Sequence, residues 1–179
     1  MISPQQALTS KQTAAALQAL VDQVATYLEE KTVHLVAVAN GGIPVARMLA
    51  ARLPALGSVG IINAAFHRDD IGLQPIPKSF QPTDLPFSID EADVLLVDDV
   101  FATGRTLRAS LNELFDQGRP ASVRFAVLVD TGNRLLPFHP DFTGLSLPTP
   151  PDQKVVVSAH PGARPEEDLL RIHLCPTAH

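Results

Sequence analysis

Short apolar runs constrain the fold of this chain more than any other feature. Val33–Ala39, Val94–Val97 and Val123–Val129 are continuous, rich in β-branched residues and separated by polar and glycine-containing segments. Val59–Phe66 has a similar character. Short apolar runs without polar alternation are typical of strands buried on both faces, as in parallel sheets covered by helices. We therefore expect a mainly parallel central sheet.

Helical patterns alternate with these runs. Apolar residues recur at three- and four-residue steps from Gln12 to Glu30, and Pro44 precedes a helical pattern from Val45 to Leu53. A third pattern runs from about Thr106 to Gln117 and is followed by Gly118. Proline in a first turn and glycine after a last turn are ordinary helix boundaries. Strands alternating with helices of these lengths predict an α/β fold with helices on both faces of the sheet.

The length of 179 residues suits one α/β domain. A single cysteine, Cys175, excludes an internal disulfide. We find no signal-peptide core and no apolar segment near the roughly 18 residues of a membrane span, which predicts a cytoplasmic protein. The net charge of −5 does not favour attraction of nucleic acid by the whole surface.

Two regions fall outside the strand and helix pattern. Residues 72–86 hold four prolines and few core-type residues, which indicates a long excursion. After Pro137 only FTGLSL and KVVVSA resemble short strands, which suggests a small subdomain over one edge of the sheet. We predict one domain over residues 1–179, with a core at about 12–157, a long loop at about 67–86 and a C-terminal hood at about 137–175.

The run VLLVDDVFATGRT, Val94 to Thr106, carries the chemistry. Its apolar residues place Asp98 and Asp99 at the carboxyl end of a buried strand, where open α/β sheets bind ligands. Adjacent carboxylates there accept hydrogen bonds from vicinal sugar hydroxyls and favour a divalent cation. The segment 102–106 adds hydroxyls, a glycine and a helix N-terminus, which favour a phosphate. A ribose 5-phosphate has this spacing of groups.

Other interpretations of this run remain open. The aspartates would simply end a strand and Thr106 would cap a helix if the motif were structural only. A receiver domain also has paired acids after an apolar strand, but its pair follows the first strand, near the N-terminus. A nucleotide hydrolase is excluded in its usual form, because no G-x-x-x-x-G-K-[ST] sequence occurs.

The same run resembles the signature of type I phosphoribosyltransferases, which bind 5-phosphoribosyl-1-pyrophosphate (PRPP). The resemblance extends to the pyrimidine operon regulatory protein (PyrR) family through HRDD at 67–70, TDLPFSI at 83–89, LNELFDQGRPASV at 111–123 and AVLVDTGNRLLP at 126–137, followed by FTGLSLPT. It implies a type I phosphoribosyltransferase fold with a small C-terminal hood. It also implies a uracil phosphoribosyltransferase that makes UMP and pyrophosphate with Mg²⁺. Some members also bind messenger RNA and attenuate transcription of pyrimidine genes in response to uridine nucleotides.

By this resemblance, Asp98 and Asp99 hold the ribose hydroxyls and lie near Mg²⁺, directly or through PRPP or water. The turn Asn40, Gly41 and Gly42 binds pyrophosphate, since its glycines allow close approach of backbone amides. The 5-phosphate is bound by Ala102, Thr103, Gly104, Arg105 and Thr106.

The resemblance also assigns roles to the long loop and to the hood. Arg68 contacts pyrophosphate, while Asp69 and Asp70 orient it or lie near Mg²⁺. The loop from Ile71 to Pro86 excludes water, and backbone groups around residues 147–149 select uracil. No residue stands out as the group that accepts the uracil proton.

This chain departs from the family pattern in two places. Many relatives carry arginines in the pyrophosphate turn, where this chain has Ala39 and Gly41, and the usual aromatic before the RDD element is His67. In a basic RNA-binding segment of relatives, Arg134 remains as the candidate RNA-binding residue. Uncharged residues or histidine replace common basic ones at Thr131, Asn133, His139 and Leu145.

Fewer phosphate partners predict weak binding of an mRNA leader. Two alternatives therefore stay open: an RNA-binding or scaffold regulator with little catalytic activity, and a phosphoribosyltransferase for another base. The resemblance implies a homodimer or homotetramer.

Overall fold

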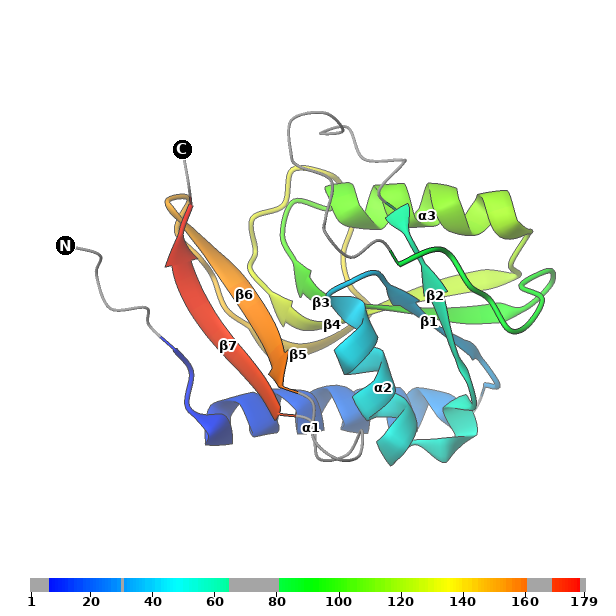
Figure 1. Cartoon of the computed structure of the whole chain (residues 1–179), viewed down its shortest axis with the longest axis horizontal. Helices are drawn as coiled ribbons and strands as arrows, with labels where there is room; N and C mark the ends of the chain where they lie inside the picture. The colour runs from blue at the N-terminus through cyan, green and yellow to red at the C-terminus, as the bar shows by residue number, and fades with distance from the viewer. Residues whose placement is uncertain (1–6, 30, 65–80, 161–168, 178–179) are drawn as a thin grey trace.

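A central sheet of parallel strands forms the core of the computed structural model, which describes residues 7–29, 31–64, 81–160 and 169–177 (Figure 1). The strand order is β2-β1-β3-β4-β5. A separate antiparallel hairpin consists of β6 and β7. The strands are β1 (His34–Val38), β2 (Val59–Ile62), β3 (Asp93–Phe101), β4 (Ser122–Asp130), β5 (Phe142–Ser146), β6 (Gln153–His160) and β7 (Leu169–Pro176). The predicted parallel sheet is confirmed.

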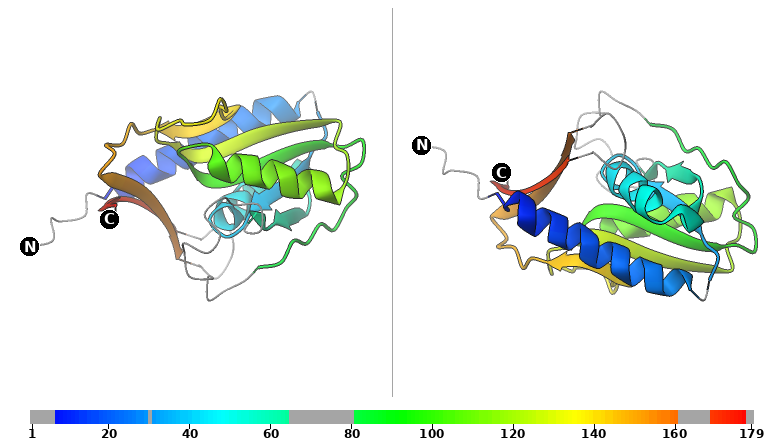
Figure 2. Two further views of the ribbon diagram at one scale, coloured as in Figure 1. Left: turned by 90° about the horizontal axis from the view of Figure 1, so that it is seen from above. Right: turned by 90° about the horizontal axis from the view of Figure 1, so that it is seen from below.

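Helices cover both faces of this sheet, as predicted. Helices α1 (Ser10–Leu28) and α2 (Gly42–Arg52) pack on one face, and α3 (Arg105–Gln117) packs on the other (Figure 2). A 3-10 helix, η1 (Pro54–Leu56), follows α2. No helix in the described ranges is long and apolar enough to cross a membrane.

The two faces explain why the strands read as continuous apolar runs. Leu35 and Leu95 are fully buried against α1 and α2, whereas their neighbours Val36 and Leu96 are fully buried on the α3 side. Because successive side chains of a strand point to opposite faces, both sets must be apolar. Full burial of such a side chain stabilises the fold by about 1.5–3 kcal/mol.

The N-terminus of α1 follows from a local signal. Thr9 Oγ1 accepts a hydrogen bond from Gln12 N at 3.2 Å, and Gln12 Oε1 accepts one from Thr9 N at 2.9 Å. This reciprocal capping box satisfies backbone donors that a helix leaves unpaired at its start. The helix begins there, slightly before the predicted Gln12.

Strand β3 is longer than the apolar run Val94–Val97 predicts. Its pairing with β1 ends at Ala37↔Val97, but its pairing with β4 continues to Phe101↔Asp130. Asp98 and Asp99 therefore lie beyond the end of β1 while the strand that carries them is still supported by β4. Hydrophobicity does not predict this extension, because Asp98 and Asp99 interrupt the apolar residues of β3.

The C-terminal part also differs from the prediction. The FTGLSL segment was expected in the hood, but it forms β5 at the edge of the central sheet, parallel to β4. Strand β7 was not predicted, because its apolar residues alternate with polar ones such as Arg171 and His173 and form no continuous apolar run, although alternation is typical of a half-buried strand. It pairs with the predicted KVVVSA strand, β6, in a hairpin at the end of the sheet to which β3 and β4 point (Figure 1).

Candidate active site

The turn between β1 and α2 lies directly against β3. A side chain added at Gly42 would overlap the carbonyl oxygen of Val97 and lie 3.1 Å from Asp98 Cα. Glycine is required here because only it lets the two backbones approach so closely. The predicted pyrophosphate turn is thereby held beside the predicted ribose-binding acids.

Gly41 brings the same turn against a carboxylate. A Cβ at Gly41 would lie 2.5 Å from Cγ and from both carboxylate oxygens of Asp99. The Asp99 side chain therefore lies on the space that a side chain at residue 41 would fill. Asn40, Gly41 and Gly42 are thus brought together with Asp99, and the peptide bond between Ala39 and Asn40 is cis.

The two acids have different surroundings. Asp98 is buried, with 6% exposure, and its Oδ1 accepts a hydrogen bond from Asp99 N at 2.9 Å. Asp99 Oδ1 accepts one from Val100 N at 2.8 Å. Burial raises the pKa of Asp99, and hydrogen bonds with Asp98 and Val100 only partly oppose this. Burial thus disfavours the charged form of Asp99, and a cation beside it would favour that form.

The predicted phosphate loop connects β3 to α3. Gly104 is the N-cap of α3 with φ +88°, a left-handed conformation that favours glycine. Thr103 Oγ1 accepts a hydrogen bond from Arg105 N at 3.3 Å. Residues 102–106 therefore surround the N-terminus of a helix, where backbone N–H groups and the helix dipole favour an anion.

A turn after β4, residues 131–138, supports this loop and was not predicted as part of the site. Leu135 N and Leu136 N both donate to Thr103 O, at 3.1 and 3.0 Å. Leu136 Cβ would lie 3.2 Å from a Cβ at Gly104. The sequence gives little warning of this contact, because the partners lie about thirty residues apart in irregular segments.

Arg134, the candidate RNA-binding residue, belongs to this supporting turn. Its Nη2 donates to Asp130 Oδ2 at 2.5 Å, and its guanidinium carbon lies 5.6 Å from the centre of the Phe101 ring. The side chain is 29% exposed. Asp130, at the end of β4, is itself buried, so the pair lies mostly inside the fold.

The segment predicted to select uracil is bonded to the same turn. Leu147 N donates to Asp130 O at 2.8 Å, and Thr149 N donates to Thr131 O at 3.2 Å. Pro148 has no N–H. Both backbone donors of residues 147–149 are therefore used inside the protein. Leu147 O also accepts a hydrogen bond from Thr149 Oγ1 at 2.7 Å.

Other predicted site residues lie outside the described residues. These are Arg68, Asp69, Asp70 and most of the loop that follows them. The end of that loop region is described: Asp84 forms an antiparallel bridge with Ile61, and Asn63 Nδ2 donates to Gln81 O at 2.5 Å. The strand β2 thus anchors the return of the chain.

The described residues do not bring together three or more His, Cys, Asp or Glu side chains that would form a complete metal site. Asp98 and Asp99 supply two adjacent carboxylates at the carboxyl end of β3. Mg²⁺ is commonly bound by one or two carboxylates, with the remaining ligands from water and substrate phosphates. The pair fits a cation that arrives with a phosphorylated substrate.

Comparison with known proteins agrees with this geometry. The phosphoribosyl transferase domain model matches residues 5–161. Among solved structures, a hypoxanthine-guanine phosphoribosyltransferase from Bacillus anthracis has a TM-score of 0.64 at 19% identity, covering 87% of each chain. The enzyme from Leishmania tarentolae in complex with GMP has a TM-score of 0.61 at 19% identity, covering 87% of this chain and 86% of that one. These likenesses establish the type I phosphoribosyltransferase fold.

Curated relatives identify the family within the phosphoribosyltransferases. The Bifunctional protein PyrR of Ralstonia nicotianae is 44% identical over 146 residues, covering 80% of this chain and 83% of the relative. That of Geobacter sp. strain M21 is 43% identical over 141 residues, covering 76% and 80%. This chain belongs to the PyrR family of phosphoribosyltransferases.

Proposed function

We propose that this protein is a uracil phosphoribosyltransferase, which transfers the ribose 5-phosphate of PRPP to N1 of uracil and releases pyrophosphate. One observation carries the proposal most strongly: the Asp99 carboxylate lies against the Gly41 turn, and the same strand leads into the loop at the N-terminus of α3. A ligand with a phosphate at one end, a diol in the middle and a pyrophosphate at the other matches this order of groups.

Each part of the site has a role in the reaction. Residues 102–106 bind the 5-phosphate, Asp98 and Asp99 accept hydrogen bonds from the ribose hydroxyls, and Asn40–Gly42 bind the departing pyrophosphate. As the C1–pyrophosphate bond breaks, positive charge develops on the ribose and negative charge on the leaving group. Fixed carboxylates and backbone amides stabilise these opposite charges without reorganising.

Mg²⁺ would be held at Asp98 and Asp99 together with PRPP, and would supply neutralisation of the pyrophosphate charge. Arg68 is proposed to assist at pyrophosphate, and Asp69 and Asp70 to orient it. The loop from Ile71 to Pro86 is proposed to keep water from the reacting carbon. Uracil and PRPP are then the substrates, UMP and pyrophosphate the products, and the cytoplasm the location.

A turnover assay tests this function. We expect UMP to form from uracil and PRPP in the presence of Mg²⁺, and removal of Mg²⁺ with a chelator to abolish the reaction. Hypoxanthine and guanine serve as control bases, because the similar structure from Bacillus anthracis is named a hypoxanthine-guanine phosphoribosyltransferase. Turnover with a purine but none with uracil would contradict the proposed base specificity while preserving the PRPP site.

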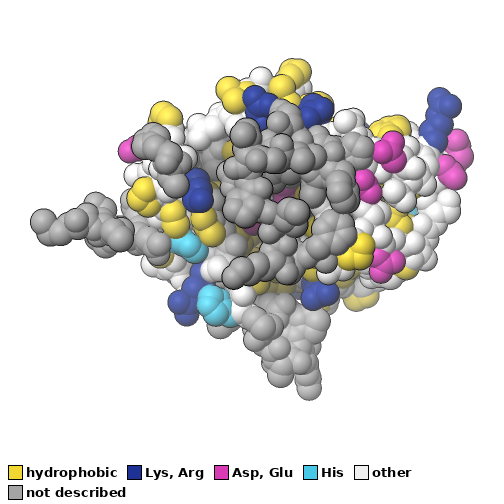
Figure 3. All heavy atoms as spheres, turned by 45° about the horizontal axis from the view of Figure 1, so that its top comes forward, with side chains coloured by type: hydrophobic (Ala, Val, Ile, Leu, Met, Phe, Trp, Pro, Cys, Tyr) yellow, Lys and Arg dark blue, Asp and Glu magenta, His cyan; other side chains and the backbone are white. Residues whose placement is uncertain are grey.

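A second activity, regulation through an mRNA leader in response to UMP, is supported by the family membership. On the face seen in Figure 3, the Lys and Arg side chains of described residues are interspersed with acidic, apolar and uncharged ones. The net charge of −5 favours weak binding of RNA. A mobility-shift titration of the pyrimidine-gene leader RNA with and without UMP tests it, and absence of a specific shift would reject it.

Assembly into a homodimer or homotetramer is likewise proposed from the family. Light scattering coupled to size exclusion measures the mass directly. A mass of one chain at micromolar concentration would contradict the proposal.

A further inference from the structure

We propose that the Arg134–Asp130 ion pair is a positioning element of the active site, which fixes the PRPP phosphate loop and the 147–149 segment relative to each other. This inference rests on the proposed function for its substrate. It assigns Arg134 a role different from RNA binding.

The pair joins both ends of a turn. Asp130 Oδ2 accepts the bond from Arg134 at 2.5 Å, and Asp130 Oδ1 accepts one from Gly132 N at 2.9 Å. Both carboxylate oxygens are therefore used within the same short segment, and Gly132 adopts φ +76° to allow it. Without Arg134 the carboxylate of Asp130, which is 7% exposed, would lose its only cationic partner among the described residues.

On one side, this turn contacts the phosphate loop. Thr131 N donates to Phe101 O at 2.9 Å, and two further N–H groups of the turn donate to Thr103 O. The Arg134 guanidinium lies over the Phe101 ring, at the residue where β3 gives way to the loop. Thr103 and Gly104 are thus supported from the turn that the ion pair closes.

On the other side, the turn contacts the segment proposed to lie near the base. Asp130 O and Thr131 O accept hydrogen bonds from Leu147 N and Thr149 N. Asn133 Nδ2 donates to Thr149 O at 3.0 Å. One short segment therefore contacts both the phosphate side and the base side of the candidate site, and the ion pair sets its shape.

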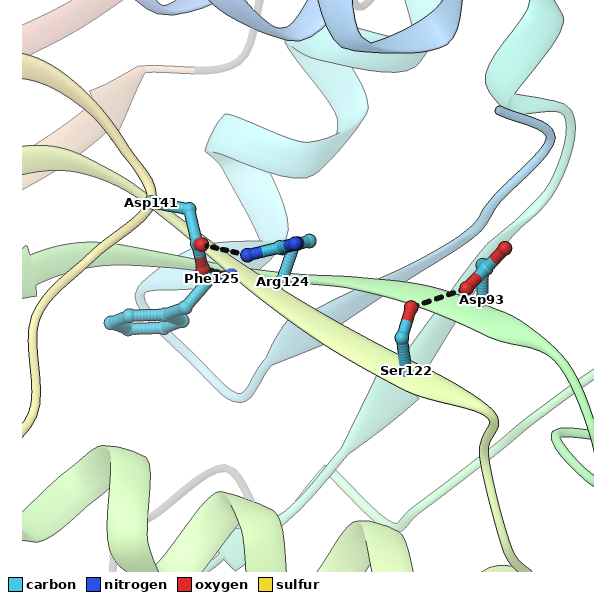
Figure 4. A network of polar contacts seen from close by, with 5 residues as sticks. All are labelled: Asp93, Ser122, Arg124, Phe125 and Asp141. Carbon is cyan, nitrogen blue, oxygen red and sulfur yellow. Dashed lines mark hydrogen bonds and ion pairs between the residues drawn. The ribbon is translucent and has the colours of Figure 1, made fainter. Parts of the chain in front are cut away.

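The same strand offers a matched control. Arg124, near the start of β4, forms an ion pair with Asp141 at 2.7 Å, with side-chain exposures of 52% and 29% (Figure 4). It lies at the opposite end of the sheet from the phosphate loop. Arg124→Gln removes an Arg–Asp pair of similar length without touching the proposed site.

Calorimetric titration with PRPP and Mg²⁺, combined with uracil turnover, tests the inference. We expect Arg134→Gln to weaken PRPP binding and raise its KM by about 10- to 100-fold, since small displacements of binding groups have effects of this size. Arg124→Gln should leave both unchanged. Arg134→Lys should recover part of the loss, because it keeps the charge but not the planar contact with Phe101.

The outcomes separate the two proposals. If the unaltered protein binds no PRPP, the proposed function fails. If it binds PRPP and Arg134→Gln binds it equally well, the inference is overturned, and loss of RNA binding in that variant would assign Arg134 to RNA instead. Thermal unfolding of each variant shows whether it is folded. If Arg134→Gln does not fold, Arg134→Lys is compared with Arg124→Gln instead.

Discussion

Strand β3 carries aspartates near both ends, and the two ends are built differently. At the amino end, Asp93 accepts a hydrogen bond from Ser122 (Figure 4). Lys31 Nζ lies 3.2 Å from Asp93 Oδ2. These bonds lower the pKa of Asp93. At the carboxyl end, burial beside Gly41 raises the pKa of Asp99. Protein contacts favour the charged form of the first carboxylate, whereas burial disfavours the charged form of the second.

This contrast is informative because residue type alone does not distinguish the two sites. A carboxylate that favours its charged form contributes to folding, as Asp93 does. A partly buried carboxylate with a raised pKa opposes folding at neutral pH, and such groups are enriched at functional sites. The contrast supports the proposed site at the carboxyl end of β3.

The largest expected effect comes from Asp99→Asn. Loss of its negative charge beside the ribose and the cation should lower kcat/KM for PRPP by about 100-fold or more, comparable to removal of one preorganised charge-stabilising group. Steady-state kinetics with varied PRPP measures this. Asp93→Asn is the matched control at the other end of β3 and should retain full activity; equal losses in the two variants would contradict the contrast.

A smaller loss is expected from Gly41→Ala. The added methyl group would lie 2.5 Å from the Asp99 carboxylate, so the carboxylate must move. We expect about a tenfold decrease in kcat/KM, in line with small displacements in active sites. In the Asp99→Asn variant, Gly41→Ala should lower kcat/KM little further, because the effects of substitutions at contacting residues are not additive. Full additivity would show that the two residues act separately.

Thermal unfolding measured at several pH values distinguishes the two ends of β3, because the substitutions Asp93→Asn and Asp99→Asn should change stability in opposite directions. The lowered pKa of Asp93 gives stability that is present above its ordinary value of 3.8 and is lost as the pH falls through the folded-state pKa. Asp93→Asn should therefore be less stable than the unaltered protein at neutral pH, with the gap closing in acid. Unchanged stability at neutral pH would indicate that the Asp93 contacts contribute nothing.

The raised pKa of Asp99 predicts that its substitution by Asn increases stability at neutral pH, unlike that of Asp93. Ionisation of Asp99 destabilises the fold as the pH rises through its folded-state pKa, so Asp99→Asn should be more stable at neutral pH, with the gap closing in acid. Differential scanning calorimetry without ligand measures this small increase in the unfolding temperature. A less stable Asp99→Asn would mean that the carboxylate is structural.

Much of this architecture follows from local sequence. Continuous apolar runs predicted β1, β3 and β4, because burial on both faces leaves an unmistakable pattern, and Gly118 marked the end of α3. Asp98, Asp99 and the 102–106 loop were predicted together because they are consecutive. Their proximity to Gly41 follows from the parallel pairing of β1 with β3.

Other features depend on contacts that no local pattern encodes. β5 joined the sheet because its backbone pairs with β4, although its sequence resembles any short strand. β7 is an exception, because its alternation of polar and apolar residues is the pattern of a half-buried strand, which an argument from continuous apolar runs overlooks. The support of Thr103 by Leu135 and Leu136, and the inward position of Arg134, arise from packing between distant segments.

A crystal structure of the protein with PRPP and Mg²⁺ tests the central claim most directly. We predict the 5-phosphate on the amides of residues 102–106, the ribose hydroxyls on Asp98 and Asp99, and the pyrophosphate on the turn Asn40–Gly42. PRPP bound elsewhere, or Asp99 still lying against Gly41 with no contact to the ligand, would contradict the account.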